Sequence, residues 1–141
     1  MKSAVLFVVI FHMAVFVVEA LLWPEPSIHR LALSKLNYDL LLAPDEQAET
    51  LRRLFVNQGF YNLFLACAGA VGLRALARGN SIVGYTLIRY MCLSAVGAGV
   101  VLALSTRAYA GAFFQAVPAG LALWLLQREA GGMLQQRTLA G

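Results

Sequence analysis

The chain has 141 residues, of which 60% are hydrophobic and only 13% charged, and its mean hydropathy is +0.72. A typical soluble domain is about 45–50% apolar and about 25% charged. A chain this short has too much surface for its volume to bury so much apolar area in water. The composition therefore predicts one membrane domain, residues 1–141. The net charge of +4 does not indicate a nucleic-acid partner, because Lys and Arg lie mostly at the ends of apolar runs, where they meet lipid headgroups.

The first predicted membrane span covers residues 4–23. Lys2 precedes this run, and a tryptophan followed by two prolines, Trp23 to Pro26, ends it. Proline cannot continue a helical hydrogen-bond ladder, and tryptophan suits the membrane interface. A cleaved signal peptide is the alternative, with a passable cleavage site at Ala20. The apolar run extends past Ala20, which favours a retained span.

The long connection, residues 24–53, is too polar to span a membrane. Its apolar residues recur at roughly helical spacing, with charged and amide residues between them: Ile28, Leu31, Leu36 and Leu40. This pattern predicts an amphipathic helix that lies in the membrane interface. Pro44, Asp45 and Glu46 then predict a helix start, since proline suits the first turn and acids suit the positive end of the helix dipole.

Three further spans are predicted at residues 54–76, 82–104 and 109–126. Each approaches the roughly 20 residues that a helix needs to cross a bilayer. Short polar turns join them, so consecutive spans are expected to be antiparallel neighbours. The predicted fold class is therefore all-α, an integral membrane four-helix bundle with one interfacial amphipathic helix between its first two spans. Small residues on the second and third spans favour close packing within the chain, and a dimer face is the alternative.

Charge predicts the orientation only weakly. Basic residues are balanced between the two sides: Lys2, Arg74, Arg78, Arg128 and Arg137 against Arg30, Lys35, Arg52, Arg53 and Arg107. The side of the long connection also carries most of the acids, so it is close to neutral. We therefore expect both termini in the cytoplasm.

Several polar residues fall inside the apolar runs, where a mid-span charge costs about 2.5–3.5 kcal/mol on insertion scales. They are His12, Glu19, Asn57, Gln58, Asn62, Gln115 and Arg89. Apart from Arg89, which is expected to reach the headgroups at the opposite end, they are predicted to converge on one polar pocket that opens under the long connection. The alternative is that they only form hydrogen bonds between helices.

No catalytic or metal-binding pattern stands out. The chain has no nucleophile–base arrangement, phosphate-binding loop or metal-ligand spacing, and one His with one Glu cannot build a zinc site. Cys67 and Cys92 are expected to behave as small buried hydrophobes. No cofactor and no metal are therefore predicted.

Three sequence motifs stand out. The first is Phe11-His12 with Val18-Glu19 and Leu22-Trp23-Pro24. The second is Val56-Asn57-Gln58-Gly59-Phe60-Tyr61-Asn62-Leu63-Phe64-Leu65-Ala66, preceded by Ala43-Pro44-Asp45, and the third is Gln115-Ala116-Val117-Pro118-Ala119. Together they resemble the motifs of a family of small bacterial membrane proteins, the domain of unknown function 1304 (DUF1304). The resemblance implies four transmembrane helices in the bacterial cytoplasmic (inner) membrane and supplies no substrate. It marks as motif positions His12, Glu19, Asn57, Gln58, Tyr61, Asn62, Gln115 and Pro118.

Three functions of different kinds follow from this reading. The first is a binding or transport-type protein whose intramembrane polar pocket takes a membrane lipid or a small molecule; its candidate ligand-binding residues are His12, Glu19, Asn57, Gln58, Tyr61, Asn62 and Gln115. The second is an accessory subunit of a larger membrane complex or a homo-oligomer. The third is a membrane enzyme that uses Glu19 or His12 as acid or base. The sequence leaves open whether the protein is an enzyme.

Overall fold

The structure is a computed structural model that describes residues 1–36 and 42–139, with side chains as far as Glu129. Its helices are α1 (Lys2–Phe16), which continues into the π-helical turn η1 (Val17–Leu21), α2 (Pro26–Leu36), α3 (Pro44–Ala77), α4 (Ser81–Ser105) and α5 (Tyr109–Leu139). The described residues form no strand. The predicted all-helical class is confirmed.

Four helical segments are long and apolar enough to cross a membrane: Lys2–Leu21, Pro44–Ala77, Ser81–Ser105 and Tyr109–Glu129. Each contains or overlaps one predicted span. Two helices are longer than the predicted spans, because α3 begins at Pro44 and α5 continues to Leu139. The early start of α3 follows the signal in the sequence, since Pro44 occupies the first turn together with Asp45 and Glu46.

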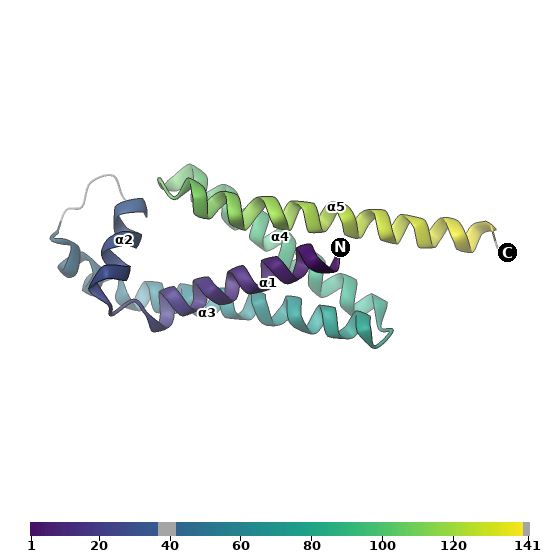
Figure 1. Cartoon of the computed structure of the whole chain (residues 1–141), viewed down its shortest axis with the longest axis horizontal. Helices are drawn as coiled ribbons and strands as arrows, with labels where there is room; N and C mark the ends of the chain where they lie inside the picture. Colours follow the sequence, from purple (N-terminus) through teal and green to yellow (C-terminus); the bar gives the residue numbers. More distant parts are fainter. Residues whose placement is uncertain (37–41, 140–141) are drawn as a thin grey trace.

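Glycines let the long helices approach closely. A Cβ atom at Gly59 would lie 2.9 Å from Ala20 Cβ on the first span, and one at Gly72 would lie 2.8 Å from Ile88 Cγ1 on α4. The α3 helix therefore packs against α1 and η1 on one side and α4 on the other, and α4 packs against α5 (Figure 1). Lipid provides no hydrophobic driving force between helices, so this close approach is what gives the chain its tertiary contacts.

The bundle is tightly packed at one end and splayed at the other. The main buried cluster joins α1, α4 and α5 through Val5, Val8, Ile88, Met91, Cys92, Ala95, Ala119, Ala122 and Leu126. Away from this cluster, the α1/α3 pair and the α4/α5 pair diverge toward the end that carries α2 (Figure 1). A second, smaller cluster of Trp23, Leu33 and Ala48 holds α2 against α3 at that end.

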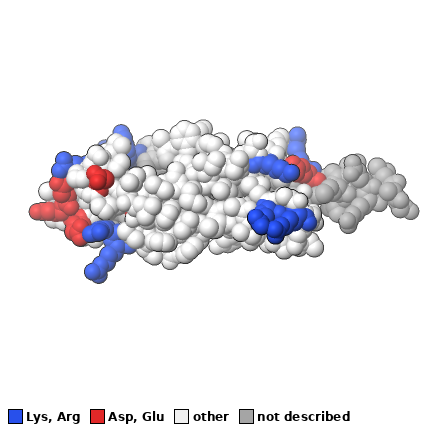
Figure 2. All heavy atoms as spheres, turned by 60° about the horizontal axis from the view of Figure 1, so that its bottom comes forward, with Lys and Arg blue, Asp and Glu red and all other residues white. Residues whose placement is uncertain are grey.

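Charged side chains gather toward the two ends of the molecule, and the face between them is a broad uncharged band (Figure 2). Such a band is what a bilayer core requires. The helix α2 runs across the long axis of the other helices at one of these ends (Figure 1). Its location in the membrane surface stays a prediction.

Four helices that all cross the membrane would place both termini on the same side of it. The test uses two single-cysteine variants, Ser3→Cys and Thr138→Cys, each in a background with Cys67→Ala and Cys92→Ala. We expect both cysteines to react with a membrane-impermeant maleimide from the same side of sealed vesicles. An even number of crossings is the physical reason. Labelling of the two positions from opposite sides would overturn the four-span topology.

Candidate functional site

The splayed end of the bundle encloses a cavity of about 830 Å³. Ligand pockets in proteins typically measure about 300–1,000 Å³. Helix α1 contributes Phe11, Ala14 and Val15 to its wall, α4 contributes Val101 and Leu102, and α2 lies across its open end. The walls are therefore largely apolar, and the few polar residues in them stand out.

Glu19 and Asn62 form the central polar contact of this cavity. The Nδ2 atom of Asn62 donates to Glu19 Oε2 at 3.0 Å and also lies 3.1 Å from the Gln58 backbone oxygen. Glu19 lies in the π-helical turn η1, a local widening that occurs frequently at functional sites. Gly59 makes the contact possible, because a Cβ there would meet the backbone nitrogen of Ala20 at 3.0 Å and Glu19 Cβ at 3.2 Å.

Gln58 and Gln115 also line the cavity, from α3 and α5. Within residues 1–36 and 42–129, neither side-chain amide has a hydrogen-bond partner, and the second oxygen of the Glu19 carboxylate has none either. The cavity thus holds unused hydrogen-bonding capacity from three helices.

His12 lies deeper than the cavity. Its side chain is fully buried, and its Nδ1 donates to the Val8 carbonyl at 2.9 Å. Its Nε2 is buried and has no partner among the described residues. Seven residues separate His12 from Glu19 on the same helix face, about 10 Å at 1.5 Å per residue. His12 is not one of the cavity-lining residues, although the ring of Phe11, which is one, packs edge-on against it at 5.7 Å.

The structure places Asn57 and Tyr61 outside this group, contrary to the expected position of Asn57 in the bundle interior. Asn57 is exposed and borders a hollow on the outer face of α3, beside Arg53 and Phe60, and Tyr61 is 55% exposed. Successive residues of a helix point about 100° apart, and this rotation takes Asn57 out of the cavity lining whereas Gln58 stays in it. Of the sequence-predicted residues, the cavity brings together Glu19, Gln58, Asn62 and Gln115.

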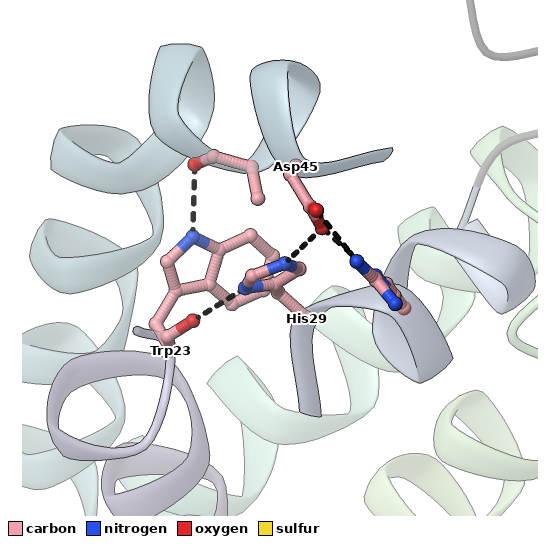
Figure 3. A network of polar contacts seen from close by, with 5 residues as sticks. Trp23, His29 and Asp45 are labelled. Carbon is pink, nitrogen blue, oxygen red and sulfur yellow. Dashed lines mark hydrogen bonds and ion pairs between the residues drawn. The ribbon is translucent and has the colours of Figure 1, made fainter. Parts of the chain in front are cut away.

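A polar network that the sequence analysis missed fastens α2 to the start of α3 (Figure 3). Trp23 is buried, stacks on Phe55 at 3.8 Å and donates from its indole nitrogen to the Ala48 carbonyl at 3.0 Å. His29 lies between them, with Nδ1 2.9 Å from the Trp23 carbonyl and Nε2 3.1 Å from Asp45 Oδ1. A histidine on the polar connection and an acid at the next helix start were the available signals.

Arg30 completes this network by donating two hydrogen bonds to Asp45, at 2.8 and 2.5 Å. Asp45 lies in the first turn of α3, before its apolar part. The hydrogen bonds from Arg30, and then that from His29, hold the pKa of the Asp45 carboxyl well below its usual range. The carboxylate therefore stays charged at neutral pH, and the contact is lost only as the pH falls through this lowered pKa.

Two cations lie where the cavity opens. Lys35, near the end of α2, and Arg107, in the turn between α4 and α5, both contribute to its lining. Among the residues that the structure describes, no three His, Cys, Asp or Glu side chains are grouped closely enough to hold a metal ion. The arrangement is suited to holding an amphipathic molecule, with polar groups at the open end and apolar walls below.

Comparison with known proteins places the chain in a family. Residues 6–127 match the family model described as "Protein of unknown function (DUF1304)", and the chain therefore belongs to this family. The match covers most of the chain and confirms the resemblance carried by its motifs. Neither the curated proteins nor the solved structures contain a match.

Proposed function

We propose that this member of the DUF1304 family is a membrane protein that binds a lipid or another amphiphile in the cavity between its helix pairs. One observation carries the proposal: Glu19, Gln58 and Gln115 line a largely apolar cavity with hydrogen-bonding atoms that no described residue satisfies. An unsatisfied polar group in hydrocarbon costs several kcal/mol. A bound molecule with its own polar group would remove that cost.

The geometry supports one orientation of the bound molecule. Its apolar part would lie along Phe11, Val15 and Val101 toward the middle of the membrane, and its polar part would lie beside Glu19 and Gln115. The helix pairs diverge at this end, so a molecule could reach the cavity from the bilayer. We further propose that the protein lies in the bacterial cytoplasmic membrane with both termini in the cytoplasm.

A subunit role in a larger membrane complex is the second candidate. It is supported by the hollow of about 890 Å³ on the outer face of α3, where Asn57 and Arg53 lie beside the exposed ring of Phe60. A polar amide on an outward-facing helix surface would be satisfied by a partner chain. An enzymatic role has weaker support, because Glu19 lines the cavity whereas His12, the other candidate acid or base, does not.

Two neighbouring residues provide a matched test of the amphiphile proposal. We expect Gln58→Leu to reduce the amount of amphiphile that co-purifies with the protein in mild detergent by about tenfold, because it removes a cavity hydrogen bond worth about 1–2 kcal/mol. Gln115→Leu should act in the same direction. The measurement is native mass spectrometry of the purified protein, with extraction and identification of the bound molecule.

Asn57→Leu is the control for this experiment. It removes an amide one residue away on the same helix, but outside the cavity. It should leave the bound amphiphile unchanged. A wild-type protein that carries no amphiphile, or an equal loss in Asn57→Leu and Gln58→Leu, would argue against binding in this cavity. A protein partner lost only in Asn57→Leu would favour the subunit role.

A further inference from the structure

The histidine that fastens α2 to α3 bridges two hydrogen-bond acceptors. His29 Nδ1 lies 2.9 Å from the Trp23 backbone carbonyl oxygen, and its Nε2 lies 3.1 Å from Asp45 Oδ1 (Figure 3). Neither acceptor carries a hydrogen, because one is a carbonyl and the other is a carboxylate that stays charged at neutral pH. A neutral imidazole has one N–H, whereas the imidazolium has two. The geometry therefore matches the charged, doubly protonated form of His29.

Loss of one proton from this ring breaks one of its two hydrogen bonds. If the remaining hydrogen is on Nδ1, the lone pair of Nε2 faces the Asp45 carboxylate, and if it is on Nε2, the lone pair of Nδ1 faces the Trp23 carbonyl. The side chain of His29 is only 8% exposed, so water does not readily replace the missing donor. Histidine is the side chain that ordinarily changes charge between about pH 5 and 8. The bridge is therefore complete in the acid part of this range and is lost as the pH rises.

The other charged groups around His29 leave it as the titrating part of this contact. Within the described chain, those that share a contact or a small hollow with it are Glu25, Arg30, Asp45, Glu49 and Arg52. Glu25 meets His29 through its backbone carbonyl, and Glu49 pairs with Arg52 at 3.8 Å. Arg30 keeps its charge throughout, and its ion pair with Asp45 is about half exposed on both sides, so it contributes little to stability.

The position of α2 affects access to the cavity. Helix α2 contributes Ala32 and Leu36 to the cavity lining and lies across its open end (Figure 1). Among the described residues, the polar side-chain contacts between α2 and α3 are made by His29 and Arg30, both to Asp45. A change in the hydrogen bonding of His29 therefore acts directly on the helix that covers the cavity.

We propose that His29 is a pH-sensitive latch, which holds α2 over the open end of the cavity while its ring is charged and lets α2 move away when the ring loses a proton. The apolar cluster of Trp23, Leu33 and Ala48 keeps α2 attached to the bundle, so release widens the range of α2 positions. The consequence for ligand exchange rests on the proposed function of amphiphile binding. The movement of α2 does not depend on it.

A distance between two spin labels tests the latch without any ligand. The labels are attached to Ser34→Cys on α2 and Leu104→Cys near the end of α4, both at exposed positions, with Cys67→Ala and Cys92→Ala in the full-length protein in lipid nanodiscs. Double electron–electron resonance at pH 5.5 should give one narrow distance distribution. At pH 8.5 the distribution should be broader and shifted to longer distances. The same distribution at both pH values would overturn the latch.

Three variants in the spin-labelled protein identify the titrating group. His29→Gln cannot change its charge and should give the same distribution at both pH values. Arg30→Gln removes the neighbouring contact to the same carboxylate and should keep the pH response. His12→Phe removes the other of the two histidines in the chain and should also keep it. A pH response that persists in His29→Gln would overturn His29 as the latch.

The rate of amphiphile release tests the consequence for the cavity. The probe is lysophosphatidylcholine with a fluorescent nitrobenzoxadiazole group on its acyl chain, because its headgroup does not change charge between pH 5.5 and 8.5. Its transfer from the protein to acceptor vesicles should be at least tenfold faster at pH 8.5 than at pH 5.5, and equally fast at both in His29→Gln. A pH-dependent distance with a pH-independent transfer rate would overturn control of the cavity by α2. Failure of the probe to bind at either pH would count against the proposed function, and the spin-label distances would still decide on the latch.

Discussion

Gly99→Val is expected to lower the free energy of unfolding by about 3 kcal/mol, the upper end of the usual cost of overpacking. A Cβ atom at Gly99 would lie 2.8 Å from Ala116 Cβ and 3.0 Å from both the Ala112 carbonyl oxygen and the Ala116 backbone nitrogen. None of these atoms belongs to a flexible side chain, so α4 and α5 would have to move apart. The measurement is the thermal unfolding of the purified protein in detergent, followed by circular dichroism.

Gly97 provides the control on the same helix. A Cβ atom at Gly97 would meet no heavy atom within 4 Å. Gly97→Val therefore changes composition and helix propensity in the same way without forcing two helices apart. It should change the free energy of unfolding by less than about 1 kcal/mol. An equal loss in the two variants would show that the α4–α5 contact is not as close as described.

Trp23→Ala is expected to cost about 3–5 kcal/mol, the usual range for removing a buried aromatic side chain. Trp23 is 1% exposed, stacks on Phe55 and donates to the Ala48 carbonyl. It forms the small cluster at the splayed end together with Leu33 of α2 and Ala48 of α3. Its loss should therefore release α2 from α3 in addition to lowering overall stability.

Thermal unfolding and hydrogen–deuterium exchange measure the two parts of this effect. Exchange should rise in residues 26–36 of Trp23→Ala well before global unfolding. Trp124→Ala is the matched control, because Trp124 is 46% exposed and its described ring contact is with Arg128, at 4.0 Å. Such an exposed contact is worth about 0.5–1 kcal/mol. Unchanged exchange in residues 26–36 of Trp23→Ala would contradict the anchoring role of Trp23.

The sequence by itself determined the membrane class and the helical layout. A bilayer requires runs of about 20 apolar residues whose backbone groups are satisfied within the segment, so four such runs with polar breaks leave few other folds. Local signals also predicted the start of α3, because the effects of Pro44 and of the acids after it act within one helical turn.

The sequence also pointed to several of the polar residues that line the cavity. The free-energy cost of placing a polar side chain in lipid selected Glu19, Gln58, Asn62 and Gln115, and the structure places these four around one cavity. The same argument selected Asn57, which the structure places on the outer face of α3. The cost of a polar group in lipid shows that it needs a partner, but the rotation of its helix decides where the side chain points.

Only the tertiary structure decided the rotation and divergence of the helices. The contact of Asn62 with Glu19 joins residues 43 positions apart, and it depends on the close approach of the helices at Gly59. The anchoring of α2 joins Trp23 and His29 to the start of a different helix. These contacts depend on which surfaces meet when distant segments pack, and periodicity within one segment carries no information about that choice.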